Sequence, residues 1–125
     1  MEIGYVGLGA MGGALARRLM LSKKLHVLDL RPEVVETFAG NGAIPAQNGA
    51  ALAQTCDVVM LCLPRSSNVR QAIFGEGGLI EGLEPGKILV DQTSGDPDET
   101  RAMAAELAEN CLLYTSDAAD DSTRV

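Results

Sequence analysis

The sequence predicts an α/β fold with a doubly wound, mostly parallel sheet, and three observations carry that prediction. Short apolar runs alternate with segments of helical periodicity along the chain. A glycine-rich turn follows the first apolar run. The second apolar run ends near an acidic residue, about 20 positions after those glycines. This alternation implies right-handed crossovers that place helices on both faces of the sheet.

Each expected element follows from its local pattern. Strands are expected at the apolar runs 2–6, 25–30, 43–45, 57–64 and 87–94. Helices are expected at 11–22, 32–40, 46–55, 66–74 and 96–110. Pro32 suits the first turn of its helix, and Gly40 suits the cap at its end. Asp96 is the expected N-cap of the last helix, with Pro97 at its first position.

Composition limits the chain to one domain and to a few classes of function. Its 125 residues match the length of a typical domain. The net charge is −7 and the basic residues are scattered, so we expect no nucleic-acid partner. The three cysteines lack metal-ligand spacing, which predicts no metal site, no disulfide framework and a cytoplasmic location. No apolar run reaches the roughly 18 residues of a membrane span, so we expect no membrane association.

The first turn carries the spacing of a dinucleotide-binding loop. Gly7, Gly9 and Gly12 form a G-x-G-x-x-G motif between a strand and a helix. Gly7 would permit the tight turn, Gly9 would let a pyrophosphate approach the backbone, and Gly12 would let the helix pack closely on the sheet. The motif alone also fits a glycine-rich surface turn, but its context favours a Rossmann-type domain.

The residues after the second strand bear on the choice of cofactor. Asp29 is placed to accept hydrogen bonds from both ribose hydroxyls of the adenosine, which favours NAD over NADP. Arg31 lies two residues later and leaves NADP open, because an arginine there can accommodate a 2′-phosphate. A solvated arginine before a helix is the simpler interpretation of Arg31, so NAD is the favoured cofactor.

Two later strands end in residues that are candidates for ligand contacts, since ligands of open parallel sheets bind beyond the carboxyl ends of the strands. Leu63 and Pro64 end one strand, where the rigid proline would fix the backbone or simply terminate the strand. The other strand ends in a cluster of small polar residues comprising Asp91, Thr93, Ser94 and Gly95. Asp96 can cap the following helix, which leaves the two hydroxyls for a ligand.

These segments together resemble the N-terminal domain of the 3-hydroxyacid dehydrogenases. That family includes 3-hydroxyisobutyrate dehydrogenase and tartronate semialdehyde reductase and is related to 6-phosphogluconate dehydrogenase. The stretches that carry the resemblance are "GYVGLGAMGGALARRL", "DVVMLCLPRSSNVRQAIFGEGGLIEGLEPGKILVD" and "DQTSGDP". The family's D-x-S-T-x-x-P signature stands here as D-Q-T-S-G-D-P, with the two hydroxyl residues exchanged.

The resemblance implies a role for each matching residue. The cofactor would contact Gly7, Leu8, Gly9, Ala10, Met11, Gly12, Asp29, Leu30, Arg31, Leu63, Pro64, Asn68 and Ser94. Thr93, Ser94 and Gly95 would shape the site of the substrate carboxylate.

The resemblance also implies a reaction for the intact protein. It is reversible hydride transfer between NAD or NADP and a small 3-hydroxy acid, similar to 3-hydroxyisobutyrate or 2-hydroxy-3-oxopropionate. The family's catalytic lysine lies beyond position 125. We therefore expect no catalytic residue in this chain, and no activity from it alone.

The end of the chain resembles something else. The stretch "CLLYTSDAADD" is similar to one reading frame of a transposase-based sequencing adaptor. This predicts a dinucleotide-binding domain at residues 1–110, incomplete at its C-terminal end, and a non-native tail at 111–125. The fold would then be truncated before the family's C-terminal helical domain, through which the intact protein is expected to form a homo-oligomer. The apolar run "CLLYT" retains the ability to pair as an edge strand.

Two alternatives to a 3-hydroxyacid dehydrogenase remain. One is a module that binds a dinucleotide without chemistry. The other is an imine reductase-type relative that shares this domain and replaces the lysine. The sequence that follows residue 110 in the gene distinguishes all three.

Overall fold

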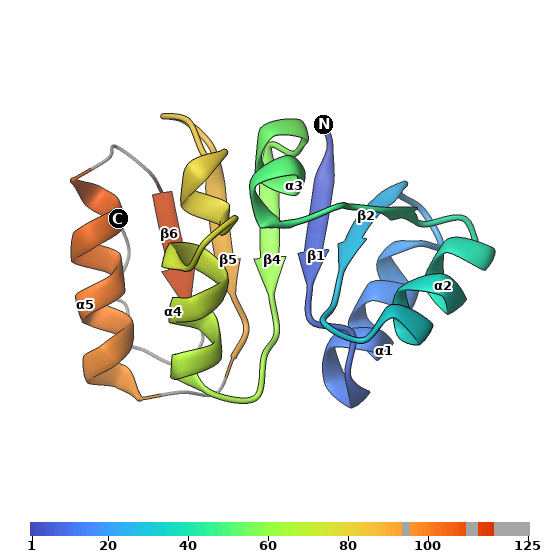
Figure 1. Ribbon diagram of the computed structural model, residues 1–125, viewed down its shortest axis with the longest axis horizontal. Coiled ribbons are helices and arrows are strands. Elements are labelled where there is room, and N and C mark those ends of the chain that lie inside the picture. Colours follow the sequence, from blue (N-terminus) through green and yellow to red (C-terminus); the bar gives the residue numbers. More distant parts are fainter. Residues whose placement is uncertain (94–95, 110–112, 117–125) are drawn as a thin grey trace.

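The computed structural model describes residues 1–93, 96–109 and 113–116. Along the chain, strands alternate with helices, as the sequence predicts (Figure 1). The strands are β1 (Ile3–Val6), β2 (Leu25–Leu28), β3 (Ile44–Pro45), β4 (Val58–Leu61), β5 (Ile88–Asp91) and β6 (Leu113–Ser116). The helices are α1 (Ala10–Leu19), α2 (Pro32–Gly40), α3 (Gly49–Thr55), α4 (Ser66–Phe74) and α5 (Pro97–Ala108), and a 3₁₀ turn covers Leu79–Glu81. Within these described residues, no helix combines the length and the apolarity needed to cross a membrane.

The sheet has the order β3-β2-β1-β4-β5-β6, and every neighbouring pair is parallel. β1, β2 and β3 follow one another from the centre of the sheet to one edge. The chain then crosses back to β4, which pairs with β1 on its other side, and β5 and β6 extend the sheet to the opposite edge. This reversal places a topological switch point between β1 and β4. The doubly wound α/β prediction is therefore confirmed.

Two apolar cores lie on the two faces of the sheet. One face packs against α1 and α2 and includes Tyr5, Leu25 and Val27, all fully buried. The other face packs against α3, α4 and α5, with Val59 and Leu89 at its centre. Successive residues of a strand point to opposite faces, and helices on both faces leave the strand ends as the open edge of the sheet.

The helix ends test the predicted caps. Asp96 is the N-cap of α5, where its carboxylate accepts a hydrogen bond from Asp98 N–H over 3.0 Å, and Pro97 is the first helical residue. Pro32 likewise begins α2. The predicted cap at Gly40 is wrong by one position, because Gly40 is the last helical residue and Asn41 is the cap. The left-handed conformation that favours glycine occurs at Gly42, with φ of 104°.

The sixth strand lies inside the segment that the sequence assigns to a non-native tail. β6 pairs in parallel with β5 over four residues, so that Leu89 faces Tyr114 and Asp91 faces Ser116. Edge pairing of this segment is therefore observed. Parallel pairing uses backbone groups and some apolar bulk, and Tyr114 supplies a side chain that is 1% exposed.

Candidate functional site

The candidate site lies where β1, β2, β4 and β5 end, at the sheet edge toward which the arrows point in Figure 1. It includes the switch point between β1 and β4, which is where open α/β sheets bind ligands.

Gly7 makes the sharp turn out of β1. Its φ is 96°, a conformation that side chains rarely adopt. A Cβ at this position would lie 2.1 Å from the carbonyl oxygen of Cys62, at the end of β4. Gly7 N–H also donates to Leu28 O over 3.0 Å, at the end of β2. The turn is thus held between the two neighbouring strands and has no room for a side chain.

Gly12 and Gly9 differ in what a side chain would meet. A Cβ on Gly12 would lie 2.2 Å from Gly7 O, so α1 crosses the end of β1 as closely as its backbone allows. A Cβ on Gly9 would enter open space, where Arg31 Nη2, at 3.9 Å, is the one non-neighbouring heavy atom within 4 Å among the residues that the structure describes. Gly12 therefore serves helix packing, and Gly9 leaves the backbone accessible.

The N-terminus of α1 faces the same open space. Gly9 is its N-cap and makes no side-chain cap hydrogen bond, and the first turn has no acidic residue. The first N–H groups of a helix have no intrahelical partner, and the helix dipole places partial positive charge there. Ala10 and Met11 are exposed. Together with Gly9, this arrangement fits a phosphate group bound by backbone N–H groups.

Asp29 lies beyond the end of β2 and accepts four hydrogen bonds. Leu8 N–H donates to its Oδ2 over 2.7 Å, which ties the β2 end to the glycine loop. Arg31 N–H donates to Oδ1 over 2.9 Å. The Arg31 side chain adds Nε to Oδ1 at 3.0 Å and Nη2 to Oδ2 at 3.2 Å. The alternative of a merely solvated Arg31 is thus incomplete, because its half-exposed guanidinium pairs with the carboxylate.

The surroundings of Asp29 favour its charged form. Partial burial acts to raise the pKa of the carboxyl, but hydrogen bonds from the Arg31 side chain and from the N–H groups of Leu8 and Arg31, together with the Arg31 charge, hold that pKa below its usual value. Asp29 is therefore a carboxylate at neutral pH.

The ends of β4 and β5 are joined by buried polar side chains. Leu63 N–H donates to Thr93 Oγ1 over 2.9 Å. Thr93 N–H donates to Asp91 Oδ1 over 2.8 Å, and the Tyr114 hydroxyl donates to Asp91 Oδ2 over 2.7 Å. Asp91 and Thr93 are each 2% exposed. These groups fix the position of the loop after β4.

The other predicted contact residues lie around this edge. Leu30 is 97% exposed beside Asp29, and Met11 is 60% exposed at the start of α1. Pro64 and Asn68 are exposed, in the loop after β4 and in the first turn of α4. Ser94 and Gly95 lie outside the described residues.

Tyr5 and Gln92 are neighbours that the sequence does not single out. The Tyr5 hydroxyl donates to Gln92 Oε1 over 2.6 Å, which links β1 to the residue after β5. Burial, with a smaller contribution from Cys62, raises the pKa of Tyr5 to about 12, so the phenol stays neutral. The two residues are 87 positions apart, so no local pattern predicts their contact.

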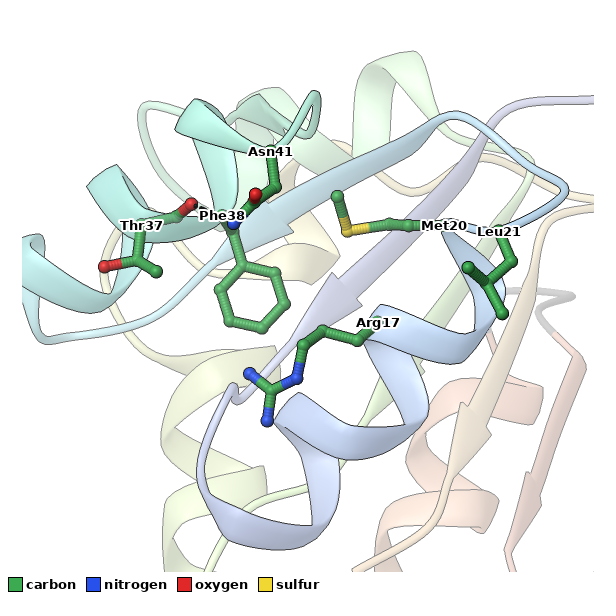
Figure 2. Close-up of a pocket in the computed structure, with 6 residues that line it drawn as sticks. All are labelled: Arg17, Met20, Leu21, Thr37, Phe38 and Asn41. Atoms are coloured by element: carbon green, nitrogen blue, oxygen red, sulfur yellow. Dashed lines mark hydrogen bonds between the residues drawn. The ribbon is translucent and has the colours of Figure 1, made fainter.

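A hollow of about 310 Å³ lies elsewhere, between α1 and α2 (Figure 2). Arg17 points over the ring of Phe38, with its guanidinium carbon 5.4 Å from the ring centroid. Met20 and Leu21 lie at the end of α1, and Thr37 and Asn41 lie along α2 and just after it. This hollow is near the far end of α1 from Gly9, so it is separate from the glycine loop.

Comparison with known families and proteins identifies the family of the chain. Residues 2–116 match the model of the NAD binding domain of 6-phosphogluconate dehydrogenase. L-threonate dehydrogenase from Cupriavidus necator is 36% identical over 113 residues, which cover 90% of this chain and 38% of that protein. Mitochondrial 3-hydroxyisobutyrate dehydrogenase from Mus musculus is 30% identical over 113 residues, covering 90% of this chain and 34% of that protein.

A solved structure gives the same result. Psf3 in complex with NADP⁺ and 2-OPP aligns with a TM-score of 0.84 and 31% identity, over 90% of this chain and 40% of that one. The chain thus spans a little over a third of the length of the relatives that it matches.

Proposed function

The chain belongs to the family of the NAD-binding domain of 6-phosphogluconate dehydrogenase, which confirms the resemblance seen in the sequence. From that premise we propose that it binds NAD or NADP across the ends of β1, β2 and β4, and that it is the cofactor-binding part of a 3-hydroxyacid dehydrogenase. The observation that carries this proposal is the open space at Gly9, above the N-terminus of α1.

Each group of residues has a part in the proposed complex. The backbone of residues 7–12 would bind the pyrophosphate. Asp29 would accept the hydroxyls of the adenosine ribose, with Leu30 and Met11 as apolar neighbours. Leu63, Pro64 and Asn68 would contact the nicotinamide ribose. When bound, the cofactor supplies hydride transfer, and this chain contributes binding and orientation.

The substrate of the intact protein is proposed to be a small 3-hydroxy acid. Ser94 and Gly95 would approach its carboxylate. Thr93 is buried and its hydroxyl oxygen accepts Leu63 N–H, which favours a role in positioning that loop. The base that accepts the hydroxyl proton would come from outside this chain, as would the contacts that form an oligomer.

Replacement of Gly9 tests the cofactor site. Gly9→Ala has room for its methyl group, so the free energy of unfolding should change by less than ~1 kcal/mol. The methyl group would project into the proposed phosphate position, so NAD affinity, measured by calorimetry on the purified chain, should fall roughly tenfold or more. Gly40→Ala is the matched control, because a Cβ there would meet no atom of the described residues within 4 Å.

The outcome separates the proposal from its alternatives. Unchanged NAD binding by Gly9→Ala would contradict the proposed site. Binding by the parent chain, followed by reduction of NAD with a 3-hydroxy acid by the protein from the full gene, would support the dehydrogenase. Binding without turnover by that full protein would favour the non-catalytic module, and turnover of imines would favour the reductase.

We further propose that residues 1–110 are the family domain and that 111–125 derive from an adaptor. The supporting observation is the likeness of "CLLYTSDAADD" to a translated adaptor. Pairing of β6 fits either origin, since it depends mainly on the backbone. Amplifying the source DNA across codon 110 and sequencing it with another library chemistry tests this. A reading frame that differs from the tail sequence after codon 110 supports the proposal. A reading frame that encodes residues 111–125 and then a stop codon contradicts the proposal.

A further inference from the structure

Positive charge is concentrated at the C-terminal end of α1, although the chain as a whole is acidic. Arg17 and Arg18 lie in the last turn of the helix, Lys23 and Lys24 follow it, and all four residues are exposed. They are four of the ten basic residues in a chain of net charge −7, and no acidic residue lies between them. These four residues are called the basic patch below.

Backbone hydrogen bonds hold the lysines close to the two arginines. Leu21 N–H donates to Arg18 O over 3.2 Å, and Lys23 N–H donates to Leu19 O over 2.8 Å. The turn is therefore folded against the end of the helix. Among the residues that the structure describes, no member of the basic patch forms an ion pair. Its positive charge is available to a partner.

The same turn exposes apolar side chains beside the hollow between α1 and α2. Leu21 is 86% exposed, and Met20 is half-buried. Both line the hollow of about 310 Å³, together with the ring of the buried Phe38 (Figure 2). A cavity of roughly 150 Å³ is large enough to hold benzene. The hollow therefore has room for one leucine or phenylalanine side chain of a partner.

Polar groups around the hollow match the chemistry of a polypeptide. Arg17 lies over the Phe38 ring, with its guanidinium carbon 5.4 Å from the ring centroid. A guanidinium has five N–H donors, and they suit carboxylates. Asn41 Nδ2 donates to Thr37 O over 2.9 Å, which directs the amide nitrogen to α2 and leaves the amide oxygen to accept a backbone N–H.

Taken singly, some of these features have simpler explanations. The helix dipole stabilises cations near a C-terminus, which accounts for Arg17 and Arg18. Single exposed apolar residues are common on protein surfaces. Neither explanation accounts for Lys23 and Lys24 in the same turn as Leu21, beside a hollow whose described lining residues include no acid.

We propose that the hollow and the basic patch together bind an acidic polypeptide segment of a partner protein. One apolar side chain of that segment would lie in the hollow, and its carboxylates would face the basic patch. Charge complementarity favours an acidic segment, and the Asn41 amide oxygen favours a polypeptide. The hollow is near the far end of α1 from Gly9, so this inference goes beyond the proposed function and does not depend on cofactor binding.

Fluorescence anisotropy on the purified chain tests the proposal. The probe is a labelled synthetic peptide in which a pair of leucines is flanked by aspartates and glutamates. Lys23→Glu combined with Lys24→Glu should weaken probe affinity roughly tenfold or more, because both charges at the contact are reversed. Leu21→Ser should weaken probe affinity about three- to tenfold, because less apolar surface is buried. Raising the salt concentration should weaken binding to the parent chain more than to the double lysine variant.

Matched controls separate charge from apolar contact. Arg101→Glu reverses an exposed charge on α5, at the other end of the sheet, and should change probe affinity by less than about twofold (Figure 1). A probe with serines in place of the leucines should bind roughly fivefold more weakly or less tightly still. A probe with lysines in place of the acidic residues should not bind. Circular dichroism and urea unfolding confirm that each variant is folded.

The possible results are distinct. Probe binding that requires both the lysines and Leu21 supports the proposal. Failure of the folded parent chain to bind the probe overturns it. Equal binding to a DNA duplex or to phosphatidylserine vesicles, without a need for Leu21, also overturns it, since any polyanion would then suffice.

Two further results would assign the surface to another occupant and so overturn an outside partner. The first is a parent chain that sediments as a dimer and becomes a monomer in Leu21→Ser, which indicates a second copy. The second is probe binding by this chain but not by the protein from the full gene, which indicates the rest of the same polypeptide. Failure to bind NAD would contradict the proposed function and leave this inference unaffected.

Discussion

The candidate site has two halves, one at the ends of β1 and β2 and one at the ends of β4 and β5. Both halves contain the same kind of hydrogen bond, but in different surroundings. In each half, the N–H of a residue two positions beyond an inner strand donates to a side chain at the end of the neighbouring strand. Leu8 N–H donates to Asp29, and Leu63 N–H donates to Thr93. The first acceptor is a carboxylate covered by a half-exposed arginine, and the second is a hydroxyl that is 2% exposed.

The difference teaches which half remains open to a ligand. At β1 and β2, glycines fix the loop and the α1 N-terminus stays exposed, while the Asp29 side chain, 8% exposed, is covered by an arginine side chain that is 53% exposed. At β4 and β5, buried side chains fix the loop, and Asp91 and Thr93 have their oxygens engaged in holding strands together. The first half therefore carries the cofactor contacts proposed here, and the second half sets the position of the loop beside them.

Gly12→Ala should disrupt the packing of α1 at the ends of β1 and β2, and it has the largest expected effect on the free energy of unfolding. Its Cβ would lie 2.2 Å from Gly7 O, so α1 has to move away from β1, and the free energy of unfolding should fall by about 3 kcal/mol or more. Alanine is favoured over glycine inside helices, so any loss reports packing. Urea unfolding measures the change. Gly40→Ala, which has open space, should be neutral or slightly stabilising.

The outcome for Gly12→Ala remains clear if the variant folds poorly. A loss of the cooperative urea transition, with rapid proteolysis, agrees with the prediction. Stability equal to that of Gly40→Ala would show that helix packing does not depend on Gly12, and the contrast between Gly12 and Gly9 would be lost.

Thr93→Val should remove the hydrogen bond that joins the ends of β4 and β5, with an intermediate effect on the free energy of unfolding. Valine keeps the shape of threonine but leaves Leu63 N–H without its acceptor, so the free energy of unfolding should fall by about 1–2 kcal/mol. Thr93→Ser retains the oxygen and is the matched control, with a smaller change expected. A Thr93→Val variant as stable as Thr93→Ser would show that the hydroxyl does not hold the β4 loop. Urea unfolding of the three proteins at pH 7 decides.

The pH dependence of stability tests the contribution of the Asp29–Arg31 ion pair at the end of β2. Its expected effect on the free energy of unfolding is the smallest of the three. The pKa of Asp29 is lowered in the folded state, so its contribution is present above its unfolded value of about 4 and is lost as the pH falls through the lower folded value. Arg31→Ala removes part of that lowering. The stability difference between the parent chain and Arg31→Ala should therefore be largest near pH 7 and should shrink below about pH 4. A difference that stays constant down to pH 3 would contradict this role for the ion pair.

The fold and half of the site were predictable from the sequence because their causes are local. Alternating apolar runs and helical periods specify a parallel sheet with crossovers. The G-x-G-x-x-G spacing and the acid after the second strand specify the loop, and Asp96 with Pro97 specifies the start of α5. The exchange of Gly40 for Asn41 as the cap of α2 is a one-residue error, of the kind expected at frayed helix ends.

The sequence by itself determined the order of the elements, the positions of the three glycines and the presence of an acid at the end of β2. Each of these depends on residues that lie close together in the chain. Only the tertiary structure decided how the polar groups are used. Leu8 and Asp29 are 21 positions apart, and Leu63 and Thr93 are 30 apart, so their hydrogen bonds exist only once the strands are side by side. Arg31 is two residues from Asp29, yet its position over the carboxylate depends on where the chain enters α2 and on the space left beside Gly9.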